Sequence, residues 1–202
     1  MFNKRSFKKG LAILIFLQAS TVPLHAETYN HPIENVGTRL VSKALELFRI
    51  HSDDDSEAKI TYALALIFWD RGTDAQRSAF ALIEDVARSD DPEAQYILGD
   101  MLSDGVGTRE NYRKAAEWYE KAALSGYPPA QMALAEVFEA GFGVPEDLVS
   151  AYAWFNIASG YGLELAQIGK ERVSLLLSET QLQEAQALAR SLHREIRNRN
   201  SH

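Results

Sequence analysis

Two consecutive stretches of the chain decide the fold. They are residues 94–129, AQYILGDMLSDGVGTRENYRKAAEWYEKAALSGYPP, and residues 130–165, AQMALAEVFEAGFGVPEDLVSAYAWFNIASGYGLEL. Aligned without a gap they are identical at ten positions, whereas unrelated stretches of ordinary composition would share about two or three. The chain therefore contains an internal repeat of 36 residues. The identical pairs are Ala94/Ala130, Gln95/Gln131, Leu98/Leu134, Gly105/Gly141, Gly107/Gly143, Glu110/Glu146, Ala115/Ala151, Trp118/Trp154, Ala122/Ala158 and Gly126/Gly162.

Each copy carries the signals of two helices. In the first copy Asp91 and Asn111 are good N-cap residues, because their side chains can accept from the free N–H groups of a first helical turn. Gly105 suits the end of the first helix, since the residue after a helix commonly takes a positive φ. The apolar spacing predicts helices over 92–103 and 112–124. In the second copy the corresponding signals are Pro128-Pro129, Gly141, Asp147 and either Gly160 or Gly162.

Helical signals continue on both sides of the two copies. A weaker copy at 58–93 lacks the Gly-x-Gly loop, and 34–50 carries apolar residues on one face of a predicted helix. The runs Thr73–Gln76 and Ser178–Gln181 are each typical of a capping box that opens a helix. No strand pattern of useful length is present. The expected organisation is 1–26 signal peptide, 27–57 linker and capping helix, 58–93 degenerate repeat, 94–129 and 130–165 repeats, and 166–202 C-terminal capping helices.

The two copies resemble the Sel1-like repeat, a relative of the tetratricopeptide repeat. This resemblance implies an all-α superhelix, a solenoid of stacked antiparallel helix hairpins. Members of the family are typically adaptors for protein complexes, and many bacterial members are exported. The sequence departs from the family pattern at Ala135, in place of the helix glycine, and at Ser150 and Ser159. The residues that carry the resemblance are Ala94, Leu98, Gly99, Gly105, Gly107, Lys114, Ala115, Trp118, Tyr119, Ala122, Ala123 and Gly126, with Ala130, Leu134, Gly141, Gly143, Ala151, Trp154, Phe155, Ala158 and Gly162 in the second copy.

The first 26 residues have the pattern of a secretory signal peptide. Four basic residues precede an apolar run over 11–17, and Ala26 is small enough to stand before the cleavage site. An uncleaved N-terminal anchor is the alternative, but a spanning helix needs about 20 apolar residues. We therefore expect a periplasmic or secreted protein, cleaved near Ala26, with no transmembrane segment in the mature chain.

Composition and charge exclude several classes of function. The 202 residues contain no Cys, which excludes disulfide scaffolds, cysteine nucleophiles and thiolate metal sites. The net charge is −7, and removal of the signal peptide would leave 17 basic and 28 acidic side chains, a net charge of −11. A chain this acidic is a poor candidate for binding nucleic acid through phosphates. Partners of positive charge are favoured instead.

The resemblance also implies where a partner would bind. In tetratricopeptide repeats, outward positions of each first helix line the groove, and most of the matching positions here are acidic. The hypothesis is a basic or mixed basic–apolar segment of another protein, held by carboxylates and by apolar contacts. The alternative is an ordinary solvated helix face. The candidate residues are Glu93, Tyr96, Asp100, Ser103, Asp104, Met132, Glu136 and Glu139.

No motif in the chain indicates catalysis, a cofactor or a metal site. The His residues are isolated, and no Gly-x-Ser-x-Gly elbow is present. The Gly-x-Gly loops lack a preceding strand and the Lys-Ser/Thr of a phosphate loop, so helix termination explains them better. The Trp118-Tyr119 and Trp154-Phe155 pairs are expected in the core. The prediction is therefore a non-catalytic adaptor or regulator, of unknown oligomeric state, that binds a protein or peptide.

Two alternatives remain open. One is an envelope hydrolase related to β-lactams or peptidoglycan, because some disulfide-rich relatives of the repeat family have been described as binding or hydrolysing β-lactams. The other is a structural subunit of a larger envelope assembly. Exposed apolar side chains over 34–50 or 163–177 would favour the assembly, whereas polar outer faces there would mark the ends of a solenoid.

Overall fold

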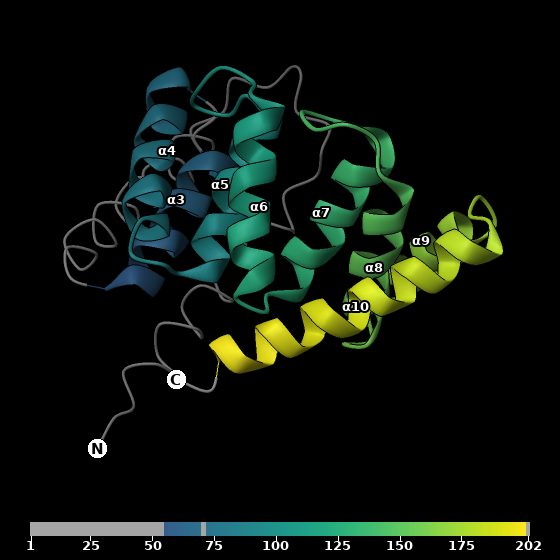
Figure 1. Cartoon of the computed structure of the whole chain (residues 1–202). Helices are drawn as coiled ribbons and strands as arrows, with labels where there is room; N and C mark the ends of the chain where they lie inside the picture. The colour runs from purple at the N-terminus through teal and green to yellow at the C-terminus, as the bar shows by residue number, and fades with distance from the viewer. Residues whose placement is uncertain (1–54, 70–71, 201–202) are drawn as a thin grey trace. The chain divides into compact units, whose positions relative to one another are not determined.

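The structure, a computed structural model, describes residues 55–69 and 72–200. Every regular element in this part of the chain is an α-helix, and no strand occurs in it (Figure 1). The predicted signal peptide over 1–26 and the predicted helix over 34–50 lie outside the described residues. The helices are α3 (Ser56–Trp69), α4 (Thr73–Ala87), α5 (Pro92–Asp104), α6 (Tyr112–Leu124), α7 (Pro128–Ala140), α8 (Leu148–Ser159), α9 (Glu164–Ser174) and α10 (Glu179–Arg199).

Consecutive helices pack against each other along the chain. α3 pairs with α4, α5 with α6 and α7 with α8, and each pair also contacts the next (Figure 1). α9 packs against α8, after which the long helix α10 returns across α8 and reaches α6. The predicted all-α solenoid of stacked helix hairpins is confirmed. The path of α10 is not part of the repeat and could not be read from the period.

The caps predicted in the two copies are confirmed. Asp91 accepts from the backbone N–H of Ala94 at 2.9 Å, and Asn111 accepts from that of Lys114 at 3.1 Å. Asp147 caps α8, and Gly105 ends α5 with φ of 70°. These side chains and this glycine satisfy backbone groups that a helix end leaves without partners.

Of the two predicted capping boxes, one is present in the structure and the other is not. The box at Ser178 is confirmed, because its side chain and that of Gln181 cap each other's backbone. The box at Thr73 is wrong, since Gly72 is the N-cap of α4 and Thr73 is already helical. The N–H of Gln76 donates to the carbonyl of Gly72 at 3.0 Å, which leaves the Thr73 hydroxyl no capping role.

The core consists largely of small side chains at equivalent repeat positions. Of the aromatic residues expected in the core, Tyr119, Trp154 and Phe155 are buried, and Trp118 is half-buried with the Lys121 ammonium 4.0 Å from the centre of its ring. Small residues let helix axes approach closely, so these positions fix the spacing of the hairpins. The fully buried alanines include Ala63, Ala79, Ala94, Ala122, Ala130, Ala135, Ala151, Ala158 and Ala166.

Two buried glutamines join successive hairpins. The Gln95 amide donates to the carbonyl of Ala87 at 3.3 Å, and the Gln131 amide donates to that of Ala123 at 3.2 Å. In each case the first helix of one hairpin is tied to the end of the preceding hairpin. Each amide nitrogen thus has a backbone partner, whereas the buried Oε1 of each glutamine has none among the described residues.

The second glycine of each Gly-x-Gly loop lies against the preceding hairpin. A Cβ on Gly107 would overlap the backbone carbonyl of Gln76, and one on Gly143 would overlap the backbone at Tyr112 and Arg113. Both glycines also have a positive φ, which side chains disfavour. Helix termination therefore accounts only for the first glycine of each loop. The second glycine allows two hairpins to approach.

We expect Gly143→Ala to destabilise the protein more than Gly162→Ala does. Both glycines have a positive φ, of 75° and 83°, but a Cβ on Gly162 would meet no atom within 4 Å. Gly162→Ala should cost about 1 kcal/mol of backbone strain. Gly143→Ala should cost about 1–3 kcal/mol more, because two packed backbones must separate. Urea unfolding followed by circular dichroism measures both, and equal losses would show that the loop contact does not hold the hairpins together.

Candidate functional site

The eight candidate residues lie on the first helices of two consecutive hairpins. Five belong to α5 and three to α7. We call the outward stripe formed by these positions on α5 and α7, and by their equivalents on α9, the first-helix surface. On α5 the half-buried members are Tyr96, Asp100 and Ser103, whereas Glu93 and Asp104 are exposed. On α7, Glu136 is exposed and Glu139 is half-buried.

Asp100 is the centre of a tyrosine cluster. The Tyr119 hydroxyl donates to its carboxylate at 2.7 Å. The Tyr96 ring lies 5.9 Å from that of Tyr119 and 5.6 Å from that of Tyr127, measured between ring centres. Three aromatic rings from α5, α6 and the turn before α7 thus gather beside one carboxylate.

Tyr119 and Tyr127 are members of this cluster that the sequence analysis did not assign to the site. Tyr119 was expected in the core, and its ring is buried, but its hydroxyl reaches the surface carboxylate. Its ring lies so close to Gly99 that a Cβ there would be 2.6 Å from one ring carbon. The glycine in the first helix was therefore the available signal, since it makes room for the Tyr119 ring at this position.

The two central carboxyl groups are held in unfavourable surroundings. Burial raises the pKa of Asp100, and the charge of Asp104 raises it further, while hydrogen bonds from Tyr119 and Tyr96 lower it. Glu136 is exposed, but partial desolvation of its carboxyl raises its pKa, as do the charges of Glu139 and Asp100, while the charge of Arg172 lowers it. Since each pKa is raised, the ionised forms of both groups lack full compensation.

Arg172 of α9 is a further charged member of this surface. It binds Glu139 through two hydrogen bonds of 2.6 Å, Nε to Oε1 and Nη2 to Oε2, and this contact raises the pKa of its guanidinium. Arg172 follows Glu136 by one repeat length, so the register could have pointed to it. No ion pair joins Asp100 or Glu136 to a basic side chain within residues 55–69 and 72–200.

The remaining candidates have more local contacts. The Ser103 hydroxyl donates to the carbonyl of Asp100 at 2.9 Å and to the Asp104 carboxylate at 3.2 Å. Met132 is half-buried against the core. Glu93 lies at the edge, where its charge helps to raise the pKa of Tyr127 after the larger effect of burial. The structure therefore brings together Tyr96, Asp100, Glu136 and Glu139 by contact or charge, and places the others around them.

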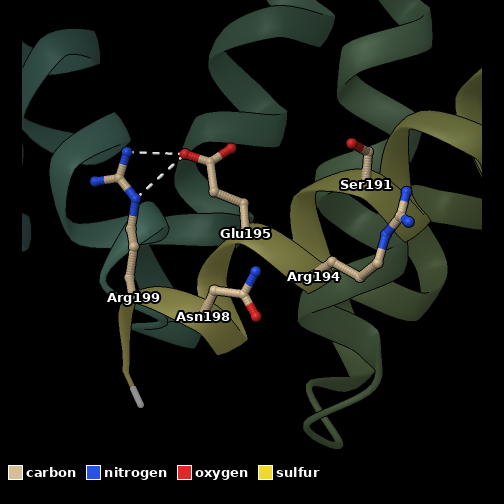
Figure 2. A pocket seen from close by; sticks show the side chains of 5 residues that line it. All are labelled: Ser191, Arg194, Glu195, Asn198 and Arg199. Atoms are coloured by element: carbon tan, nitrogen blue, oxygen red, sulfur yellow. Dashed lines mark hydrogen bonds and ion pairs between the residues drawn. The ribbon is translucent and has the colours of Figure 1, made fainter. Parts of the chain in front are cut away.

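Two hollows lie elsewhere, along α10. One, of about 520 Å³, is lined by Ser191, Arg194, Glu195, Asn198 and Arg199 (Figure 2). The other, of about 810 Å³, lies between the end of α8 and the middle of α10. None of the eight candidate residues lines either hollow.

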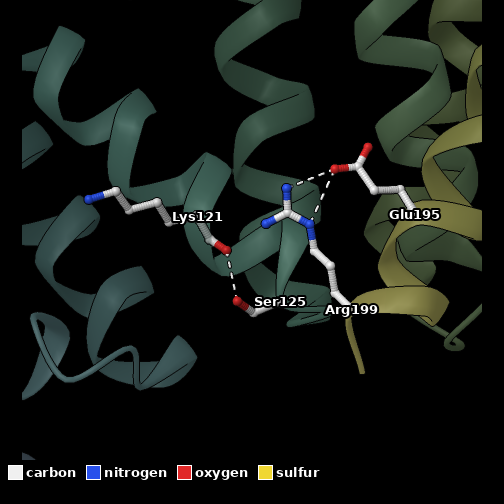
Figure 3. Close-up of polar contacts among 4 residues, drawn as sticks. All are labelled: Lys121, Ser125, Glu195 and Arg199. Carbon is white, nitrogen blue, oxygen red and sulfur yellow. Dashed lines mark hydrogen bonds and ion pairs between the residues drawn. The ribbon is translucent and has the colours of Figure 1, made fainter. Parts of the chain in front are cut away.

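The C-terminal end of α10 makes structural contacts near the first hollow. Arg199 pairs with Glu195 at 2.8 Å, close to the end of α6, where the Ser125 hydroxyl donates to the carbonyl of Lys121 (Figure 3). Asn200 then donates to the carbonyl of Ser125 at 3.4 Å. The bond from Asn200 attaches the end of the C-terminal helix to α6, whereas the other two contacts lie within one helix each.

Neither metal binding nor membrane spanning finds support in this part of the chain. Within residues 55–69 and 72–200, no three His, Asp or Glu side chains are grouped so that they could hold a metal ion. None of the described helices combines the length and the apolar character needed to cross a bilayer.

The geometry defines an α-helical repeat protein with an acidic, tyrosine-bearing surface on its first helices. Residues 92–127 and 128–159 each match the Sel1 repeat. Two consecutive Sel1 repeats therefore occupy residues 92–159 of the chain. No curated protein matches the chain.

Three solved structures are similar to this chain. A protective antigen present in uropathogenic Escherichia coli strains, which displays the same repeat fold, is 25% identical with a TM-score of 0.65 over 96% of this chain. A Sel1 repeat protein from Oxalobacter formigenes is 28% identical with a TM-score of 0.52, over 70% of this chain and 98% of its own. Cysteine rich protein B of Helicobacter pylori, 21% identical with a TM-score of 0.52, shares the fold over 64% of this chain and 93% of its own. The chain spans 40% of the length of the Escherichia coli antigen.

We expect Asp100→Asn to raise the melting temperature at pH 7. The raised pKa of Asp100 means that its ionised form is less favourable in the folded chain than in the unfolded chain. The Asp100 carboxyl therefore contributes its full stabilisation at a pH below its pKa in the unfolded chain. This stabilisation is lost as the pH rises through its pKa in the folded chain. The neutral amide avoids that loss and can still accept from the Tyr119 hydroxyl, so the gain should vanish at pH 3.

Thermal unfolding at pH 7 and pH 3 measures this difference. Glu117→Gln, which removes the same charge from an exposed position on α6, is the matched control and should change little. A lower melting temperature for Asp100→Asn at pH 7 would mean that the hydrogen bonds to the charged carboxylate outweigh its desolvation.

Proposed function

We propose that this chain is an exported, non-catalytic adaptor or regulator that binds a basic segment of another protein through its first-helix surface. The observation that carries this proposal is the pair of carboxyl groups, Asp100 and Glu136, whose charges lack an ion pair within the described residues. A Lys or Arg side chain from a partner would supply the missing positive charge. Tyr96 and Tyr127 would provide ring faces for its aliphatic stem and its cationic group.

The family supports a binding role. Sel1 repeats are generally protein-interaction modules and are typically non-catalytic. A solenoid of helix hairpins presents an extended surface built from equivalent positions, which suits a protein segment better than a small molecule. No observation among the described residues favours the hydrolase alternative.

Export is proposed on the sequence alone. The basic start, the short apolar run and Ala26 are those of a cleaved signal, which would deliver the mature chain to the periplasm or outside the cell. The mature chain would then carry a net charge of −11, which attracts cationic partners over long range.

Assembly into a larger structure is a second candidate function. Exposed apolar side chains over 163–177 favour it, and four large ones are exposed there: Leu165, Ile168, Leu175 and Leu176. The similar Escherichia coli antigen is also much longer than this chain.

Peptide binding tests the adaptor proposal. Random 16-residue peptides displayed on phage are selected on the full chain, and the affinity of the best peptides is measured by calorimetry. We expect Lys- and Arg-rich peptides whose binding weakens as salt is raised. Asp100→Asn combined with Glu136→Gln should weaken binding at least tenfold without lowering the melting temperature.

The matched control is Glu117→Gln combined with Glu120→Gln, which removes the same total charge from exposed positions on α6. It should leave the affinity within about twofold. If no basic peptide is enriched, or if both double variants bind equally well, the first-helix surface is an ordinary solvated face.

A further inference from the structure

Four large apolar side chains are exposed on α9 and in the turn that follows it, and we call them the apolar cluster on α9. Leu165 is 66% exposed, Ile168 54%, Leu175 86% and Leu176 61%. Single apolar side chains on a surface need no explanation, but four within a stretch of 12 residues mark an interaction site.

Two of these four side chains share a face of α9 with Arg172. Leu165 and Ile168 lie seven and four residues before it on α9, which is the spacing of neighbours on one side of a helix, and Leu175 and Leu176 follow in the turn that ends α9. Arg172 binds Glu139 and its charge acts on Glu136. The apolar cluster therefore continues the same surface that carries the candidate carboxylates on α7.

The repeat register gives the same placement. Leu165, Ile168, Leu175 and Leu176 follow the α7 positions by 36 residues. The first-helix surface therefore changes in character along the chain, from acidic and aromatic on α5, through acidic on α7, to apolar on α9. The equivalent positions are Glu93, Pro129 and Leu165; Tyr96, Met132 and Ile168; Ser103, Glu139 and Leu175; and Asp104, Ala140 and Leu176.

A different stripe of α9 shows that this helix departs from the regular repeat. Gln95, Leu98 and Leu102 of α5 are buried. Their equivalents on α9 are Gln167, Lys170 and Ser174, none of them fully buried, and Gln167 bonds Glu171 on its own helix. In α5 this stripe faces the preceding hairpin, because Gln95 bonds the carbonyl of Ala87 on α4. Its exposure on α9 therefore shows that α9 does not pack on α8 as α5 packs on α4, so the regular repeat ends with α8.

We infer that the apolar cluster on α9 binds the apolar part of the same partner segment whose basic part lies at Asp100 and Glu136. This inference rests on the proposed function and makes the partner bipartite, with basic residues at one end and two or three large apolar residues at the other. Neighbouring helix axes lie on the order of 10 Å apart. α7 contacts α9, and an extended segment advances about 3.3 Å per residue, so about three residues separate the part at Glu136 from the apolar part.

The same phage selection, repeated on the full chain and two variants, tests this arrangement. Ile168→Ser combined with Leu175→Ser removes the apolar contact at exposed positions, and Asp100→Asn combined with Glu136→Gln removes the charges. Peptides selected on the unaltered chain should contain both a basic and an apolar cluster. They should bind the apolar variant at least tenfold more weakly and keep their salt dependence, whereas the charge variant should lose that dependence.

Tyr161→Ser is the matched control, because it removes a similarly exposed large side chain from the turn before α9. It should leave the affinity unchanged. Basic peptides without an apolar cluster, which bind the apolar variant as well as the unaltered chain, would overturn this inference and leave the proposed function intact. Absence of any enriched peptide would overturn both.

The last test is the oligomeric state of the chain without peptide, measured by sedimentation. We expect the unaltered chain and the apolar variant to sediment as the same species. A self-associated chain that the Ile168→Ser and Leu175→Ser changes dissociate would overturn the inference, because the occupant of the cluster would then be a second copy of the chain.

Discussion

Close approach of helices at small side chains is the constraint on which the structure depends. Fully buried alanines recur at equivalent positions of successive hairpins, and Gly99 and Gly143 let a ring and a backbone come nearer than a Cβ would allow. Such packing contributes little area per residue but fixes the distance and angle between elements. Once that spacing is set, a residue one repeat later occupies an equivalent place on the next hairpin.

The same constraint explains how much could be predicted from the sequence. The period of 36 residues and the caps at Asp91, Asn111 and Asp147 specify the helices and their stacking, because these signals are local. Features that depend on the path between elements could not be predicted in this way. The return of α10 across α8 has no repeat to indicate it, and Thr73 lost its capping role because α4 begins one residue earlier than its hydroxyl would require.

The candidate site was predictable in outline only. The repeat register predicted that Asp100 and Glu136 lie on one surface. It did not predict that the Tyr119 hydroxyl bonds Asp100, because hydrophobic spacing assigns the Tyr119 ring to the core. A tyrosine side chain has an apolar ring and a polar hydroxyl, and the spacing of apolar residues predicts only where the ring lies. The partial desolvation of the two carboxyl groups also depends on neighbouring elements. This desolvation makes the ionised forms of the two carboxyl groups less favourable and so costs some stability of the folded chain at neutral pH.

The return of α10 has a consequence for how such a chain can change its length. Asn200 contacts Ser125, 75 residues earlier in the sequence, so the last helix covers hairpins that were completed long before it. A repeat array without such a helix can gain copies at its end, because each unit touches only its neighbours. Here a copy added after α9 would have to move α10 away from α8 and α6. Duplication is therefore compatible with this architecture only ahead of α9, and the contact between α10 and α6 would have to form anew each time.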